Sequence, residues 1–393
     1  MTRGVDGEVA SEGEKSPTLA PIGESGPFHW SREHDEFRSV LRNLVTARAS
    51  LTCAPSPKSE DAAERALWRN WSEGLGLPGL AVPERYGGSG FSRLELSIAA
   101  NELGRSVVGG PLFASAVLAT ETLLAAGGQV ADDILPALAG GTKVATLAVV
   151  EAAQRWQPDE VATTVSGGSA PRLRGVKDAV LTAEAADLLV VAAREDVGVS
   201  LFVVEAGDGV DVTPLQVLDS SRSMARVTLT DAPARRVGAA GDGWLMVERA
   251  LEAGSVFLAS EQVGGSQALL AHGVEHARTR VQFGQPIGRF QGVKHRLADM
   301  AVRTELADSA ASWAAWQQPG TDQARLGASV ARAYCSEAYL ETALDAIQVH
   351  GGMAITWEHH AHRFLRRARA DAAVLPTPTQ HRRALESLIG TGL

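Results

Sequence analysis

The sequence predicts an α+β protein in which helices, a β-rich segment and long helices follow one another. Apolar residues recur at helical spacing through residues 31–141. Short β-rich runs separated by Gly, Asp and Ser follow a break at 140–142, and helical spacing returns after a second break at 241–243. We therefore expect an N-terminal helical domain, a middle antiparallel β sandwich or barrel, and a C-terminal bundle of long helices.

The expected domain boundaries follow these breaks. Residues 1–26 are rich in Gly, Ser, Glu and Pro, which predicts a disordered tail. The expected domains are an N-terminal helical domain at 27–141, a β domain at 142–240 and a C-terminal bundle at 241–393. Within that bundle, helices are expected at 244–279, 289–317, 321–350, 359–373 and 378–389.

Composition narrows the class of protein. The chain has 393 residues with a formal net charge of −9, which argues against binding nucleic acid because phosphate contacts need a basic surface. No apolar run reaches the roughly 18 residues of a membrane span, and the N-terminus lacks the apolar segment of a signal peptide. Two widely separated cysteines, Cys53 and Cys335, suit a reducing compartment. We expect a cytoplasmic protein without a nucleic-acid or membrane partner.

The stretch RVQFGQPIGRFQ at residues 280–291 is the strongest local motif. Glycine and proline in its middle end one helix, so the chain presents Arg280, Phe283 and Gln291 around a turn. A guanidinium placed there could clamp a diphosphate, while Phe283 could pack on an aromatic ring. Taken alone, the stretch is more typical of a helix connection with an exposed arginine.

A second motif, QVHGG, ends with Gly351 and Gly352. A Gly-Gly pair after a helix lets a ligand approach the backbone closely, and Gln348 lies one turn earlier. By itself the pair is more typical of a helix C-cap.

Together and in this order, the motifs resemble those of the acyl-CoA dehydrogenase family. The resemblance covers about residues 60–391 and includes PERYGGSG at 83–90, NELGR at 101–105, LADM at 297–300 and the arginines at 363 and 366. It implies two helical domains around a β domain, FAD as cofactor, an acyl-CoA or acyl-carrier-protein substrate, and a dimer of dimers. The implied chemistry is removal of an α-proton by a glutamate and transfer of the β-hydride to the flavin, which gives a trans-2-enoyl thioester.

The resemblance also implies which residues hold FAD. Arg280, Phe283 and Gln291 would reach the FAD of a neighbouring subunit. Gln348, Gly351 and Gly352 would hold its adenosine–diphosphate end, and Thr377 is the surviving threonine of the family's Glu-Gly-Thr triplet.

The catalytic glutamate of the family is missing at both of its usual positions. The base of the Glu-Gly-Thr triplet corresponds to Leu375, and the alternative base on the preceding long helix corresponds to Gly254. Glu252 lies near Gly254 but about 200° around the helix, and Glu358 matches a position that is mostly structural. These two are weak candidates, so the catalytic base stays unassigned.

The β domain departs from the family pattern as well. The family's Glu-Pro-x-x-Gly-Ser-Asp loop corresponds to residues 151–158, and its Trp-Ile-Thr strand beside the flavin ring corresponds to 179–181, which read Ala-Val-Leu. The residues that grip the flavin ring are therefore replaced, while those that reach a neighbour's FAD are retained. We expect Lys177, on the same strand, to end that strand in solvent.

The segment GGMAITWEHHAH resembles an actinobacterial subgroup of the family, some of whose members are the base-less subunits of α2β2 heterotetramers that act on bulky thioesters such as steroid side-chain CoA esters. Three interpretations remain open. The chain is a dehydrogenase subunit with a base-bearing partner, a self-sufficient flavoenzyme with a relocated base, or a flavin-free member repurposed for cyclisation, isomerisation or binding. We favour the first.

A cluster of histidines, His350, His359, His360 and His362, suggests a metal site at first sight. Adjacent helical residues diverge by about 100°, however, and no Cys or Asp completes a ligand set. We expect no metal.

Overall fold

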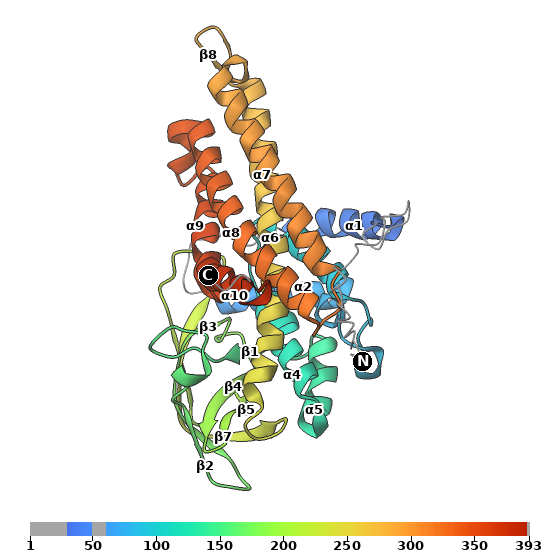
Figure 1. Cartoon of the computed structure of the whole chain (residues 1–393), viewed down its shortest axis with the longest axis vertical. Coiled ribbons are helices and arrows are strands. Elements are labelled where there is room, and N and C mark those ends of the chain that lie inside the picture. The colour runs from blue at the N-terminus through green and yellow to red at the C-terminus, as the bar shows by residue number, and fades with distance from the viewer. Residues whose placement is uncertain (1–29, 49–59, 391–393) are drawn as a thin grey trace, which may run out of the picture.

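The computed structural model describes residues 30–48 and 60–390, so the tail predicted at 1–26 lies outside the described residues. Helices form both ends of the described chain and strands its middle, as predicted (Figure 1). The N-terminal helices are α1 (Arg32–Arg48), α2 (Glu60–Leu75), α3 (Arg93–Gly104), the π-helix η4 (Leu112–Ala119), α4 (Thr120–Ala126) and α5 (Gly128–Ala139).

The middle region is a barrel. Its strands are β1 (Ala145–Ala148), β2 (Thr164–Ser166), β3 (Arg172–Leu181), β4 (Leu188–Glu195), β5 (Gly198–Glu205), β6 (Val210–Pro214) and β7 (Met224–Val237). Strands β4, β2, β3, β7 and β5 pair in a closed ring, with β1 joined to β4 and β6 to β7. One detail differs from the expected antiparallel sheet, because β1 and β2 run parallel to β4. A parallel pair needs a crossover, and for β1 and β4 the intervening β2 and β3 provide it.

Long helices build the C-terminal bundle. They are α6 (Gly243–Thr279), α7 (Gln291–Ala315), α8 (Asp322–His350), α9 (Ala361–Val374) and α10 (Pro378–Leu388). Helix α6 starts beside the barrel and runs to the opposite end of the molecule, where the short strands β8 (Val281–Gln282) and β9 (Gln285–Pro286) turn the chain into α7 (Figure 1). None of the helices in the described ranges has both the length and the apolarity of a membrane span.

Two glycines let α3 and α6 touch through their backbones. A Cβ atom at Gly104 would collide with the carbonyl oxygen of Glu261, and a Cβ atom at Gly264 would collide with that of Asn101. The contact is therefore reciprocal, and each helix supplies the glycine that the other requires. This close approach fixes the N-terminal helices against the spine of the C-terminal bundle.

Substitution of Gly264 tests this contact. Gly264→Ala should lower the free energy of unfolding by about 3 kcal/mol, because the new methyl group must push two backbones apart. Gly292→Ala is the matched control, since a Cβ atom there meets nothing within 4 Å, and it should be neutral or stabilising by up to about 1 kcal/mol. Urea unfolding followed by circular dichroism measures both, and equal stabilities would contradict the close-contact argument.

Candidate functional site

A cavity of about 350 Å³ lies between the barrel and the C-terminal end of α9. Gln154 and Trp156 of the loop at 151–158 line it, together with Ala179 of β3 and Val374 of α9. The fold therefore brings together the two barrel segments that the resemblance places beside a flavin ring. The volume of the cavity lies within the range of small-molecule sites.

The backbone of this cavity is unusual at two places. Gln154 and Ala179 both adopt left-handed conformations, with φ of 51° at each. Residues other than glycine rarely adopt such backbone angles, and strained residues of this kind concentrate at binding sites. The conformation of Ala179 belongs to an irregularity in the pairing of β3 with β7 between Lys177 and Val180.

The two usual base positions meet in an apolar contact beside this cavity. A Cβ atom built on Gly254 would lie 2.9 Å from Cδ1 of Leu375 and 2.7 Å from Cδ2 of Leu118. Phe113, from the same π-helix as Leu118, closes a third side at 3.5 Å. Leu375 is only 1% exposed. The place that a catalytic carboxylate would occupy is thus filled by hydrocarbon.

Glu252, the first weak candidate for a base, is held in a buried ion pair. Its carboxylate contacts Arg93 at 2.5 Å and Arg249 at 3.7 Å, and it accepts a hydrogen bond from the amide of Gly320 at 3.4 Å. It faces a different groove, which lies between α6, α8 and α10. A carboxylate that neutralises two guanidinium groups is a structural group here.

Glu358, the second weak candidate, is exposed in the turn before α9. Hydrogen bonds from its own backbone and from Thr356 lower the pKa of its carboxyl group. The side chain does not line the cavity beside Leu375. Neither candidate from the sequence therefore stands where the base of the family would.

Thr377 caps a helix in this structure. Its hydroxyl accepts a hydrogen bond from the amide of Gln380, and the amide of Thr377 donates to the Gln380 side chain, which completes a capping box at the start of α10. Thr377 is exposed in the short connection between α9 and α10.

Sequence reasoning missed a buried network of charges behind the cavity. Arg367 of α9 is 1% exposed, and its guanidinium contacts Glu261 of α6 and Asp219 of the loop before β7. Burial favours neutral side chains, but here it is outweighed: the pKa of Arg367 is raised by the carboxylates and that of Asp219 is lowered by Arg367. Both groups stay charged.

Asp371 is the exception in this network. Its Oδ1 atom accepts a hydrogen bond from Arg222 at 3.1 Å, but its Oδ2 atom is buried and has no hydrogen-bond partner. Burial raises the pKa of Asp371 to about 6. Arg222 lines the cavity and lies over the ring of Phe113 at 5.0 Å, so the network reaches the sealed base position. In the sequence, the charged residues of this buried network look no different from the charged residues of a solvent-exposed surface.

The expectation for Lys177 is wrong. Its side chain is fully buried, and its Nζ atom donates to Glu151 at 2.6 Å and to the carbonyl oxygen of Val149 at 3.2 Å. Burial lowers the pKa of Lys177 to about 8, although Glu151 opposes this shift. The alternation of residues along the strand could not reveal that Lys177 is buried, because the carboxylate that compensates its charge belongs to Glu151, 26 positions away.

The residues predicted to reach a neighbour's cofactor lie around the far end of α6. Arg280 is the first residue after the helix, and Phe283 follows in the β8–β9 turn with a left-handed φ of 52°. Phe283 is 92% exposed, and Gln291 begins α7 as an exposed side chain. Within one subunit this turn lies at the opposite end from the barrel (Figure 1). These side chains therefore cannot serve the cavity of their own chain.

The Gly-Gly corner lies close to this turn. His276, one helical turn before Arg280, stacks on His350 with ring centroids 4.6 Å apart, and His350 directly precedes Gly351. Gly351 and Gly352 are exposed, a Cβ atom on either would meet nothing within 4 Å, and Gln348 is exposed beside them. Both predicted cofactor-binding groups thus present open surface at one end of the bundle.

The histidines around this corner form a chain of ring contacts. His350 contacts His359, which stacks on His360. Among the described residues, no group of three or more Cys, His, Asp or Glu has an arrangement suited to a metal ion.

Two family models match the chain on either side of the barrel. The N-terminal domain of acyl-CoA dehydrogenases matches residues 31–142, and the C-terminal domain matches residues 241–374. The chain belongs to the acyl-CoA dehydrogenase family. It is 30% identical over 360 residues to the acyl-CoA dehydrogenase IpdE2 of Mycobacterium tuberculosis, covering 90% of this chain and 96% of that protein.

Two solved structures are similar to this chain over more than nine tenths of its length. The ChsE4–ChsE5 complex of Mycobacterium tuberculosis matches with a TM-score of 0.79 and 27% identity over 93% of this chain and 99% of that one. The prolyl acyl carrier protein oxidase AnaB matches with a TM-score of 0.83 and 26% identity over 92% and 100%.

Asp371 gives this family member a testable pH dependence. A carboxyl group with a raised pKa stabilises the fold below its unfolded pKa, near 4, and loses that contribution as the pH rises to about 6. Between pH 4 and pH 7 this group should lower the free energy of unfolding of the wild-type protein by an amount on the order of 2–3 kcal/mol, and Asp371→Asn should abolish that decrease. Denaturant unfolding at several pH values measures it. The exposed Asp208→Asn is the control, and parallel profiles for wild type and Asp371→Asn would refute the assignment.

Proposed function

We propose that this chain is a subunit of an FAD-dependent acyl-CoA dehydrogenase that contributes part of the FAD site but no catalytic base. The observation that carries the proposal is the sealed contact between Leu375 and Gly254. A partner subunit of the same family, with a glutamate at one of these two positions, supplies the base. The assembly is a dimer of dimers in the cytoplasm.

The residues of this chain fit FAD divided between two subunits. The turn with Arg280 and Phe283 presents an exposed guanidinium and an exposed aromatic ring at the end of the chain's bundle that lies far from its own barrel. Phe283 is 92% exposed and Val281 on the same turn is 53% exposed, so the turn presents apolar surface that a neighbouring molecule would cover. The exposed backbone of Gly351 and Gly352 allows a diphosphate to approach closely. Bound FAD supplies the hydride acceptor of the reaction.

The side chains around the cavity would orient a ligand rather than exchange protons with it. Leu375 and the phenylalanine of the π-helix exclude water from the base position. Arg222 is held by Glu261 and Asp371, so its guanidinium has a fixed position at the cavity wall. These carboxylates compensate its charge, so Arg222 would orient the ligand by a hydrogen bond to one of the ligand's oxygen atoms.

The relatives support an acyl thioester, carried by CoA or by a carrier protein, as substrate. The ChsE4–ChsE5 structure is described as a complex of two chains, which parallels the division of labour proposed here. AnaB is described as a prolyl acyl carrier protein oxidase, so a carrier protein in place of CoA is compatible with this fold. We propose an acyl-CoA ester or an acyl-carrier-protein thioester as the substrate class.

The decisive experiment measures the number of FAD molecules bound per purified chain. The chain purified alone should contain well under one FAD per chain and show no dehydrogenation. Co-purification with a family member that carries the base should raise both FAD content and acyl-CoA-dependent bleaching of the flavin absorption. A yellow, active preparation of the chain alone would overturn the base-less assignment.

Arg280→Ala tests the shared FAD site. Loss of a charge-assisted contact to a diphosphate should weaken FAD binding by about tenfold or more in the assembled complex. Arg278→Ala is the matched control, because Arg278 is also exposed and lies two residues earlier, on α6. Fluorescence titration of apoprotein with FAD measures both, and equal affinities would refute the role of Arg280.

Glu358→Gln tests the remaining base candidate. Because the carboxylate is exposed and interacts only locally, turnover of the assembled enzyme should stay within about twofold of wild type. A stopped assay with substrate and an artificial electron acceptor measures it. A hundredfold loss in a folded variant would instead make Glu358 the base.

A second candidate function is a non-redox step on a thioester without flavin. The observation that favours it is the composition of the cavity, where Ala179 and Trp156 stand in place of the family's ring-gripping residues. The FAD count separates the two functions. A partner complex that stays colourless and still binds acyl thioester would support the non-redox function.

A further inference from the structure

Two separate segments of the barrel form one side of the cavity between the barrel and α9. The loop after β1 contributes Gln154 and Trp156, and β3 contributes Ala179. Glu151 lies three residues before Gln154, and Lys177 lies two residues before Ala179. Neither charged side chain lines the cavity, so both lie behind its walls. The proposed function gives these two residues no role.

The carboxylate of Glu151 holds the two ends of the loop together. Its oxygen atoms accept hydrogen bonds from the amides of Ala162 and Thr163, each at 3.0 Å, and from the Thr163 hydroxyl at 2.8 Å. At the start of the loop, the amide of Gln154 donates to the carbonyl oxygen of Glu151 at 2.8 Å. The segment with Gln154 and Trp156 therefore begins and ends at one residue.

A second cation holds the later part of the same loop. Arg194 of β4 donates to the carbonyl oxygens of Pro158 and Val161, at 2.5 and 2.7 Å. Arg194 thus acts on residues beyond the cavity wall, whereas Gln154 is held through Glu151.

Lys177 joins the loop to β3. Its Nζ atom donates to the Glu151 carboxylate at 2.6 Å. The amide of the next residue, Asp178, donates to the carbonyl oxygen of Val150 at 2.8 Å. Ala179 follows with its left-handed backbone, at the irregularity in the pairing with β7. The ion pair therefore connects the loop to the strand segment that forms the other wall.

The charges around this ion pair leave Lys177 no other carboxylate partner among the described residues. Asp178, its neighbour in the chain, is taken up by Arg226 of β7 at 2.6 Å. Burial raises the pKa of Glu151, but Lys177 and the hydrogen bonds from Thr163 lower it below its usual value. The pair is charged at neutral pH, and a loop that moved away would leave a buried ammonium group without its carboxylate.

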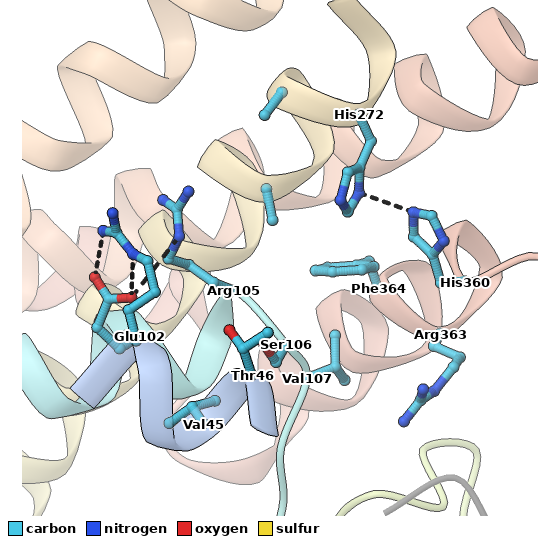
Figure 2. Close-up of a pocket in the computed structure, with 13 residues that line it drawn as sticks. Val45, Thr46, Glu102, Arg105, Ser106, Val107, His272, His360, Arg363 and Phe364 are labelled. Atoms are coloured by element: carbon cyan, nitrogen blue, oxygen red, sulfur yellow. Dashed lines mark hydrogen bonds and ion pairs between the residues drawn. The ribbon is translucent and has the colours of Figure 1, made fainter. Parts of the chain in front are cut away.

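A buried pair elsewhere in the molecule provides a comparison. Glu102, whose side chain is inaccessible to solvent, accepts two hydrogen bonds from Arg42, at 2.9 and 2.7 Å (Figure 2). That pair joins α1 to α3, at a groove that shares no lining residue with the cavity. It is a reference for an ion pair that contributes to stability alone.

We propose that Lys177 is a positioning residue of the cavity, which acts through Glu151 to hold the wall formed by Gln154 and Trp156 against the ring of a bound flavin. The identity of this ligand rests on the proposed function. Lys177 touches no ligand itself, since its side chain is fully buried and does not line the cavity.

Hydrogen–deuterium exchange of the full chain without ligand tests the connection between loop and strand. Lys177→Met should raise the exchange rates of the Ala162 and Thr163 amides by about tenfold or more, because the carboxylate that accepts their hydrogen bonds loses its anchor. Glu151→Gln removes the charge but keeps the shape of the side chain, and it gives a second variant should the first fail to fold. Lys143→Met, which removes the same charge before β1, is the matched control.

The visible spectrum of bound FAD tests the positioning. In the complex with the base-bearing partner, Lys177→Met should weaken FAD binding by about tenfold or more and shift the flavin absorption bands toward those of free FAD. Arg42→Gln, which breaks the comparison pair with Glu102, should lower the free energy of unfolding but leave that spectrum unchanged.

The outcomes are distinct. Faster exchange in Lys177→Met together with an altered flavin spectrum supports the proposal. Exchange equal to that of the wild type overturns it. Faster exchange with an unchanged spectrum overturns it as well, because the pair would then be structural in the same sense as that of Glu102. A wild-type complex that binds no FAD refutes the proposed function instead, and the exchange rates then decide alone whether Lys177 positions the loop.

Discussion

The contacts of Arg367 hold the barrel and the helical bundle in one arrangement. Its guanidinium, on α9, reaches Asp219 at the barrel and Glu261 in the middle of α6. Arg222, in the loop before β7, pairs with Glu261 of α6 and with Asp371 of α9. Ion pairs therefore connect the barrel with two helices of the bundle. Buried charges are costly unless they are paired, and a shift of one domain would leave several of them unpaired. The cavity between barrel and α9 is therefore held at a defined width.

Helix α6 transmits this arrangement along the molecule. Gly254 lies at the sealed base position and Gly264 at the backbone contact with α3. The same helix ends at the turn that carries Arg280. Because a helix rises by 1.5 Å per residue, these features keep fixed separations and directions. A displacement of α6 at one of them would be felt at all of the others.

Periodicity and breaks in the sequence were enough to predict the order of elements. Long amphipathic stretches and glycine breaks are local signals, so the five C-terminal helices fall within a few residues of their expected ranges. Motif spacing pointed to Leu375 and Gly254 as the two usual base positions, which stays a prediction, and the structure brings these two residues into contact. The assignments of Arg280 and Thr377 to a cofactor, and the domain boundaries themselves, remain predictions.

The rest depends on contacts between distant segments. Asp371 and Lys177 look like solvated charges in the sequence, because their environments are set by Arg222 and by Glu151 elsewhere in the chain. The parallel pairing of β1 with β4 has the same origin, since it is created by chain crossover and leaves no local pattern. Burial of a charge is a property of the assembled fold, and a single sequence carries little information about it.

The sealed contact at Gly254 has an evolutionary consequence. A glutamate at 254 would strike Leu375 and Leu118, and a glutamate at 375 alone would place a carboxylate at a buried position that is packed against Gly254. Either single change would destabilise the protein before it could restore a base. If the proposed function holds, a base at either of these two positions would therefore require two or more coordinated substitutions. A single substitution toward an independent active site would first lower the stability of the fold, so dependence on a partner chain would be hard to reverse.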